Sequence, residues 1–297
     1  MPNQNTSQNS NQNSNKSTGQ AITMTLLVRN EEDIVAENIR FHRALGVDSF
    51  IVMDNRSTDS TRNILKDLSR DIPIEYLHQP EDTYDQRTWV TQMARHAARD
   101  HGADWVINTD ADEFWTPTEG GLKALLSRLD ARTGTLAVKR HNAVVVTDSH
   151  DKLAGRSHPS LTTLFEAESR NNLGRPLPGK VLHRAIPDVS VAQGNHAVEG
   201  VPGETELAGD RLRILHFPHR TLGHYKQKIR LGGAAYARND RLPKGLGATW
   251  RAHFAGLEDG TVDRFWQDIV HFAKDLRSGI RSGSLFHDDV VAAFLRA

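Results

Sequence analysis

The stretch Trp105-Val-Ile-Asn-Thr-Asp-Ala-Asp-Glu-Phe114 joins an apolar run to three carboxylates within four residues. The apolar run predicts a buried strand, and the carboxylates at its end repel one another unless a compact cation lies between them. Alternate residues at a strand end point the same way, so we expect Asp110 and Asp112 to face one site. Carboxylates with few other ligands suit Mg²⁺ or Mn²⁺ shared with substrate phosphates.

Two other interpretations of this acidic cluster stay open. An apolar strand that ends in Asp-Glu resembles a Walker B element, but that element requires a P-loop, and the chain has no GxxxxGK[ST] stretch. The cluster can also be a solvated acidic turn without function. We favour a metal–diphosphate site, because the carboxylates follow a strand at the position where α/β folds bind ligands.

The chain before this stretch alternates between apolar runs and amphipathic segments. The expected strands cover 22–28, 49–53, 73–77 and 105–108, and the expected helices cover 34–45, 61–68 and 85–99. Short connections between them predict an α/β fold with a doubly wound, mostly parallel sheet flanked by helices. Asp54 and Asp59 follow the second strand closely, as Asp110 and Asp112 follow the fourth. We therefore expect a ligand site at the carboxyl ends of these strands.

The second half of the chain is less regular. Further strands are expected at 135–140, 142–147, 181–186, 189–192 and 211–216, long loops at 148–180, and helices at 221–238, 261–276 and 288–297. Residues 1–20 are mostly Asn, Gln, Ser and Thr and predict a disordered tail. We expect one catalytic domain over 21–220 and a C-terminal helical region over 221–297 packed on it.

The composition excludes several classes of protein. The 297 residues include 37 Lys+Arg and 37 Asp+Glu, and this balance gives no sign of nucleic-acid binding. The absence of cysteine rules out disulfides and thiolate metal sites. A mean hydropathy of −0.55 and the lack of a long apolar run argue against a transmembrane helix. We expect a cytoplasmic protein with at most peripheral membrane contact, through the basic and aromatic segments 225–230 and 265–277.

Three motifs together resemble a known family. Leu27-Val-Arg-Asn-Glu31, Val52-Met-Asp-Asn-Arg-Ser-Thr-Asp59 and the stretch 105–114 are similar to family-2-type glycosyltransferases with the nucleotide-diphospho-sugar transferase (GT-A) fold. A looser similarity continues through Gly179-Lys180, His196, Leu215-His-Phe-Pro-His-Arg220, Lys228 and Trp250-Arg251. That part resembles the bacterial subgroup that acts in surface-polysaccharide assembly.

The resemblance implies roles for individual residues. The residues Val28, Arg29, Asn30 and Glu31 would contact the nucleotide base and ribose. Asp54 would accept a hydrogen bond from the base, and Arg87 or Arg95 is expected near the same site. Asp110 and Asp112 match the Asp-x-Asp motif and would hold Mn²⁺ or Mg²⁺ on the donor diphosphate.

Other candidate residues lie later in the chain. A late histidine often completes the metal shell in this fold, so His216 is expected as a third ligand. Asp112, Glu113 and His196 are candidates for the catalytic step, and Lys180 for contact with a phosphate. Each histidine also fits an ordinary loop position. We interpret Lys226, Lys228 and Arg230 as a solvated basic face. Spacing alone does not choose a general base among Asp148, Asp151, Glu166 and Glu168.

The expected activity is metal-dependent transfer of a sugar from a nucleotide diphosphate to a hydroxyl group. The acceptor would be a glycan or a lipid-linked sugar, in polysaccharide or lipopolysaccharide assembly. The alternatives are a nucleotide-sugar hydrolase or nucleotidyltransferase, which would use the same metal and diphosphate, and a non-catalytic sugar-nucleotide-binding scaffold. The acidic cluster by itself does not separate these activities.

Overall fold

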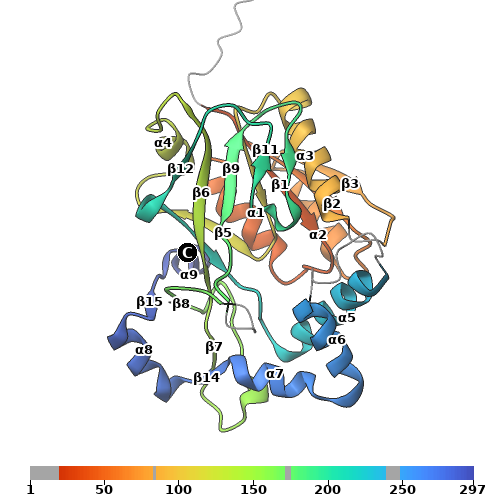
Figure 1. The fold of residues 1–297 in the computed structure, drawn as a ribbon, viewed down its shortest axis with the longest axis vertical. Coiled ribbons are helices and arrows are strands. Elements are labelled where there is room, and N and C mark those ends of the chain that lie inside the picture. The colour runs from red at the N-terminus through yellow and green to blue at the C-terminus, as the bar shows by residue number, and fades with distance from the viewer. Residues whose placement is uncertain (1–19, 83–84, 171–174, 239–247) are drawn as a thin grey trace, which may run out of the picture.

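The computed structural model describes residues 20–82, 85–170, 175–238 and 248–297 (Figure 1). The tail expected over 1–20 lies outside the described residues, apart from Gln20. The first strand begins at Ile22, as the sequence predicts.

The helices and strands alternate through the first half, and strands dominate the middle of the chain. The strands are β1 (Ile22–Val28), β2 (Ser49–Asp54), β3 (Ile74–His78), β4 (Trp105–Thr109), β5 (Glu113–Pro117), β6 (Thr133–Asn142), β7 (Val145–Thr147), β8 (Leu164–Glu166), β9 (Lys180–Arg184), β10 (Ser190–Val191), β11 (Val198–Glu199), β12 (Glu204–Leu207), β13 (Leu212–His216), β14 (Val270–Phe272) and β15 (Leu285–His287). The helices are α1 (Val35–Ala44), α2 (Thr61–Leu68), α3 (Gln86–Asp100), α4 (Leu122–Leu126), α5 (Leu222–Arg238), α6 (Ala248–Asp259), α7 (Val262–Ile269), α8 (Leu276–Ser282) and α9 (Val290–Arg296).

One large sheet forms the centre of the molecule, in the order β3-β2-β1-β4-β9-β6-β13-β5, with β12 also paired to β6. The first four strands are parallel to one another. Strand β9 runs antiparallel to both of its neighbours, and β5 runs antiparallel to β13. The predicted doubly wound, mostly parallel sheet is therefore confirmed, with an antiparallel insertion that the sequence reasoning did not specify.

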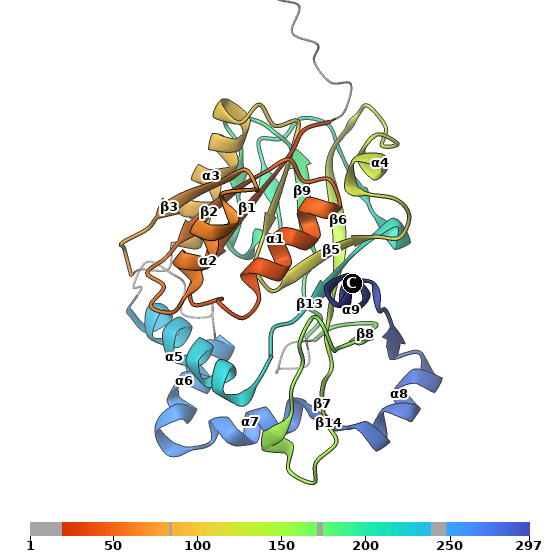
Figure 2. The same ribbon diagram turned by 180° about the vertical axis from the view of Figure 1, so that it is seen from behind.

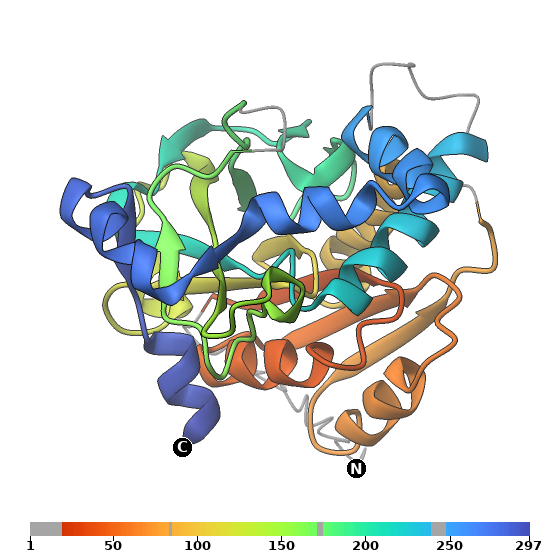
Figure 3. The ribbon, with the colours of Figure 1, turned by 90° about the horizontal axis from the view of Figure 1, so that it is seen from below.

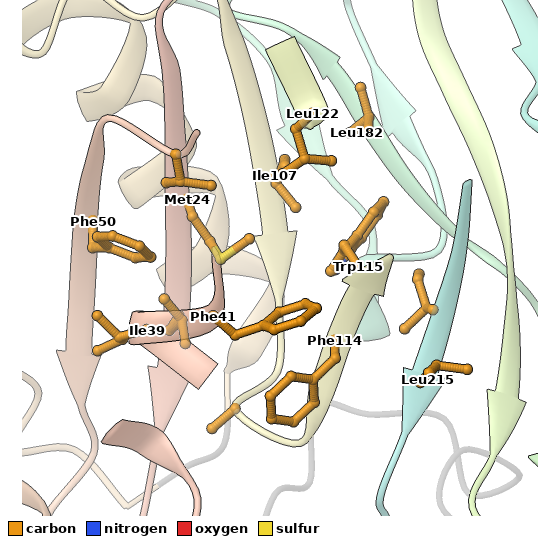
Figure 4. Close-up of a cluster of buried hydrophobic side chains, with 14 of the residues drawn as sticks. Met24, Ile39, Phe41, Phe50, Ile107, Phe114, Trp115, Leu122, Leu182 and Leu215 are labelled. Carbon is orange, nitrogen blue, oxygen red and sulfur yellow. The ribbon is translucent and has the colours of Figure 1, made fainter. Parts of the chain in front are cut away.

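Helices cover both faces of the parallel strands, because alternate residues of each strand point to opposite sides. Phe50 and Val52 of β2 pack in the same cluster as residues of α1 and α2, whereas Ile51 and Met53 pack with α3. The larger cluster extends across the sheet to β13, and Figure 4 shows its central side chains. Figures 1 and 2 show the flanking helices from the two sides.

Polar side chains inside the sheet are satisfied by one another. Thr25 donates from Oγ1 to Asn108 Oδ1 over 2.7 Å, and Asn108 Nδ2 donates to His183 Nε2 over 3.0 Å. His183 Nδ1 in turn donates to the carbonyl of Arg184. Burial lowers the pKa of His183 to about 4, so the neutral ring serves this chain of hydrogen bonds across β1, β4 and β9.

The C-terminal segment is tied into the rest of the fold at three points. Strand β14 pairs with β7, β15 pairs with β8, and Phe294 of α9 packs edge-to-face on Phe41 of α1 at 5.3 Å between ring centroids. Figure 3 shows the C-terminal helices from below, across one end of the molecule. The division into a domain over 21–220 and a region over 221–297 stays a prediction.

Several elements differ from the expectation. The single helix expected over 261–276 is wrong, because α7 ends at Ile269 and Val270–Phe272 pairs as β14 with β7. The structure also contains β5, α4, α6 and β8, which the sequence analysis did not predict. In the part of the chain that the structure describes, no helix is both long and apolar enough to cross a membrane.

Candidate functional site

A cavity of about 550 Å³ opens at the carboxyl ends of β1 and β4, a size that suits a small ligand. The loop after β1, the turn after β4, the ends of β6 and β13, and helices α5 and α6 all contribute to its lining. Helix α6 approaches α5 closely at two glycines. A Cβ on Gly232 would lie 2.6 Å from the ring of Trp250, and one on Gly233 would lie 2.4 Å from Phe254.

The end of β1 and the loop after it contribute Val28, Arg29, Asn30 and Glu31 to the cavity. Asn30 adopts a left-handed conformation with φ of 56°, which asparagine tolerates better than most residues. Its backbone N–H donates to Ser57 Oγ, and its Oδ1 accepts from the backbone N–H of Thr58. These bonds join the loops that follow β1 and β2.

Asp54 does not line the cavity, although the sequence analysis expected it to contact the nucleotide. Its buried carboxylate accepts from the hydroxyl of Tyr76 over 2.9 Å and from the backbone N–H of Ser57 over 2.8 Å. Asp54 therefore ties the loop after β2 to Tyr76 of β3. Its neighbour Asn55 reaches the cavity wall.

The turn that carries the carboxylates is held by α1. The buried Asn38 donates from Nδ2 to the carbonyls of Ala111 and Glu113, over 3.0 and 2.8 Å. His42 accepts from the backbone N–H of Trp115 at Nε2, so its Nδ1 carries the proton and donates to Asn38. Burial lowers the pKa of His42 to about 3, which keeps this tautomer neutral. A buried polar pair on one helix thus fixes the β4–β5 turn.

Glu113 lies beneath the cavity wall and pairs with two cations. Lys180 Nζ lies 3.0 Å and Arg140 Nη1 3.1 Å from Glu113 Oε1. Burial opposes ionisation of Glu113, yet Lys180 and Arg140 lower its pKa to about 2. The same Lys180, only 1% exposed, lies 2.8 Å from Asp110 Oδ2. Burial raises the pKa of Asp110, and Lys180 opposes that shift. Lys180 thus holds two carboxylates of the turn together.

Asp112 is the buried carboxylate of the cavity. Its Oδ2 accepts from Lys228 Nζ over 2.6 Å, and its Oδ1 lies 3.5 Å from His216 Nε2. Burial opposes ionisation, but Lys228 holds the pKa of Asp112 well below its usual range. The interpretation of Lys228 as part of a solvated face is therefore wrong. Tyr225 of the same segment is also buried, whereas Arg230 is exposed, and the expected membrane contact of segment 225–230 stays a prediction.

Arg220 links the loop after β1 to the segment before α5. Its guanidinium is 1% exposed and lies 2.6 Å from both Glu31 Oε2 and Asp33 Oδ2. Its Nη2 also donates to His224 Nε2. Burial raises the pKa of Glu31 to about 7, and Arg220 opposes that shift. Arg220 therefore fixes one wall of the cavity against the other.

The groups around Asp112 suit a divalent cation. His216 Nδ1 lies 2.8 Å from Asn142 Oδ1 and donates its proton there. Its Nε2 then presents a lone pair to Asp112 Oδ1, so two electron-pair donors face each other. Burial lowers the pKa of His216, which favours the neutral, ligating form. A donor set of two carboxylates and one neutral imidazole fits Mn²⁺, and the carboxylates fit Mg²⁺.

The structure places the remaining candidates outside the cavity lining. Arg87 is more than half exposed and donates to Ser190 of β10. His196 donates from Nδ1 to the carbonyl of Gly179, and burial followed by Lys180 lowers its pKa to about 4. Lys180 itself is buried under Asp110, as described above. Of the candidate metal ligands, Asp110, Asp112 and His216 do line the same cavity.

Other residues of the site were not singled out from the sequence. They are Asn38, Arg140, Asn142 and Arg220. Asn38 gave one signal in the sequence, because it is a polar residue next to Ile39 within the apolar stripe of a predicted helix. Arg220 closes the His-Phe-Pro-His-Arg segment, where only the histidines had drawn attention.

Comparisons with known proteins identify the family of this chain. Residues 26–187 match the family described as glycosyl transferase family 2, which is more than half of the chain. The chain therefore belongs to glycosyl transferase family 2 and is a glycosyltransferase. This confirms the resemblance seen in the motifs and the α/β fold expected from it. A search of curated proteins found no match.

Solved structures show only distant similarity. The crystal structure of S. aureus TarS residues 1–349 shares 12% identity, with 83% of this chain and 74% of that chain covered and a TM-score of 0.43. The mannosyltransferase PcManGT from Pyrobaculum calidifontis, solved with GDP-Man and Mn²⁺, shares 14% identity, with 94% and 79% covered and a TM-score of 0.44.

Proposed function

We propose that this glycosyltransferase moves a sugar from a nucleotide diphosphate donor to a hydroxyl acceptor with the help of Mn²⁺ or Mg²⁺. The observation that carries the proposal is that Asp110, Asp112 and His216 all line one cavity at the carboxyl ends of β1 and β4. That edge is where doubly wound sheets bind ligands. Bound there, the cation would supply Lewis-acid stabilisation of the leaving diphosphate.

The chain's own residues have distinct tasks in this proposal. Residues 28–31 form the wall that would hold the base and ribose of the donor. Asn142 orients His216 through Nδ1, and Lys180 holds Asp110 in place. Lys228 and Arg140 line the cavity as further cations, and they would offset the charge of the diphosphate.

The acceptor would enter from the side built by the later part of the chain. Arg170, Arg175 and Trp250 line the cavity there. Cationic and aromatic side chains suit a sugar hydroxyl acceptor on a glycan or on a lipid-linked sugar that carries phosphate. We propose that the reaction belongs to polysaccharide or lipopolysaccharide assembly at the cytoplasmic side of the membrane.

A thermal-shift panel tests the proposal. UDP, GDP, CDP and dTDP are each added with Mn²⁺, with Mg²⁺ or with EDTA. One diphosphate should raise the melting temperature in the presence of metal, because a ligand that binds only the native state stabilises it. Asp112→Asn should abolish the shift, whereas Asp188→Asn, at an exposed carboxylate outside the cavity, should retain it.

Two outcomes would contradict the proposal. If the nucleotide-induced shift in melting temperature is the same in EDTA, donor binding does not depend on a metal ion. Release of free sugar from the donor at the same rate with and without acceptor would identify a hydrolase instead.

A further inference from the structure

A second cluster of metal-binding side chains lies away from the cavity, where β3 meets the end of α3. His96 Nε2 and His101 Nε2 lie 2.8 and 2.7 Å from the same oxygen, Glu75 Oε2. One ligand atom from each residue lies within 4.8 Å of the other two. Glu75 comes from β3 at the edge of the sheet, His96 lies one turn before the end of α3, and His101 is the C-cap residue of α3. None of the three lines the donor cavity.

The proton count around His96 is unusual. Its Nδ1 lies 2.6 Å from Asp100 Oδ2, while its Nε2 faces Glu75. A neutral imidazole carries one N–H, so it donates to one carboxylate and turns a lone pair toward the other. The arrangement is complete only with a cation at Nε2, either a second proton or a metal ion.

The side chains have the freedom to adopt a coordination geometry. Ligand atoms around a tetrahedral Zn²⁺, with bonds of about 2.1 Å, stand about 3.4 Å apart. The present separations of 2.7 and 2.8 Å need to widen by about 0.6 to 0.7 Å. The three side chains are 19 to 37% exposed, so they can rotate, and water can reach a fourth position.

We propose that Glu75, His96 and His101 bind Zn²⁺, with a water as fourth ligand. Asp100 would accept the Nδ1 proton of His96 and so fix the ligating tautomer, as carboxylates do behind zinc-bound histidines. Two imidazoles and one carboxylate favour zinc over the oxygen-seeking Mg²⁺. The metal would tie the edge strand β3 to the end of α3. This inference is independent of the donor site.

The experiment titrates the protein with Zn²⁺ alone, without nucleotide, and measures zinc affinity and stoichiometry by calorimetry. All proteins carry Asp112→Asn, so that the cavity contributes no metal site. The parent, which carries only Asp112→Asn, should bind one Zn²⁺. Asp100→Asn, at a side chain that is 61% exposed, should weaken binding by about 10- to 100-fold while the protein stays folded. Glu75→Gln and His101→Gln should weaken it further.

A matched control is His150→Gln, because His150 is an exposed histidine beyond β7. It should bind zinc like the parent. Co²⁺ added to the parent should give the intense visible absorption of a tetrahedral site, and Glu75→Gln should lose it. Equal zinc affinity in the parent and in Asp100→Asn, Glu75→Gln and His101→Gln would overturn the proposal. So would a parent that binds no zinc, because the cluster would then be only a protonated hydrogen-bond network.

Discussion

Replacing Lys180 by Met tests how the carboxylate turn is held together. Lys180 is 1% exposed, and its ammonium lies 2.8 Å from Asp110 Oδ2 and 3.0 Å from Glu113 Oε1. Methionine fills a similar volume but leaves Glu113 with Arg140 as its remaining cation. The variant therefore removes one charge and little packing.

The expected magnitude follows from burial. Removing one partner of a buried ion pair costs about 3–5 kcal/mol, because the other charge stays buried without compensation. Lys123 offers a matched control, since it lies 2.6 Å from Asp48 Oδ1 but both side chains are 39% exposed. Breaking such a surface pair costs about 0–1 kcal/mol. Lys180→Met should therefore lose several times more stability than Lys123→Met.

The loss should depend on pH in a defined direction. Lys180 helps lower the pKa of Glu113 to about 2, below its ordinary value of 4.5. The wild-type stabilisation from this carboxylate is complete above pH 4.5 and fades as pH falls toward 2. Without Lys180 the pKa of Glu113 rises, so Glu113 becomes protonated at a higher pH in the variant than in the wild type. The stability difference should be largest near pH 7 and smaller near pH 4.

Urea denaturation at both pH values measures these differences from the midpoints. Calorimetry should also show weaker binding of the preferred nucleoside diphosphate, because Asp110 loses its anchor. The reasoning is refuted if Lys180→Met and Lys123→Met shift the urea midpoint equally at pH 7. It is also refuted if the Lys180→Met deficit grows as the pH falls.

Three further predictions concern the residues around this turn. The pKa of Glu31 is raised to about 7 from 4.5, so between these pH values the native state binds a proton that the unfolded state has lost. The free energy of unfolding should therefore fall as pH rises from 5 to 8. In urea denaturation at several pH values, Glu31→Gln should make the midpoint depend less on pH. Asn38→Ala leaves the carbonyls of Ala111 and Glu113 without their donor, at about 1–3 kcal/mol each, and calorimetry should show weaker nucleotide binding; unchanged stability and affinity would contradict this role. Phe114→Ala should cost about 3–5 kcal/mol in urea denaturation, because the buried ring packs between Phe41 and Phe217; a loss under 1 kcal/mol would show that the core collapses around it.

Local patterns were enough for the parallel half of the sheet. The helix expected over 61–68 is found at those residues as α2, and the strand expected over 22–28 is found as β1. Each has a strong apolar period and lies between turn residues. Strand β5 was missed because its first residue, Glu113, was read with the acidic motif rather than with the apolar residues that follow. Strand β14 was missed because Ile269 and Phe272 continue the helical spacing of α7, and only pairing with β7 makes the segment extended.

The sequence by itself determined the fold class, the family and the position of Asp110 and Asp112 at a strand end. The fold class and the strand end follow from the order of apolar and polar residues over short stretches, which periodicity reports directly, whereas the family follows from the resemblance of three motifs. Only the tertiary structure decided which charges meet. Lys180 reaches Asp110 across 70 residues, and Lys228 reaches Asp112 across 116. The physical reason is that the local sequence around a lysine is the same whether its side chain is solvated or forms a buried ion pair. The partner carboxylate is distant in the sequence, and only the packing of the strands and helices brings it within reach.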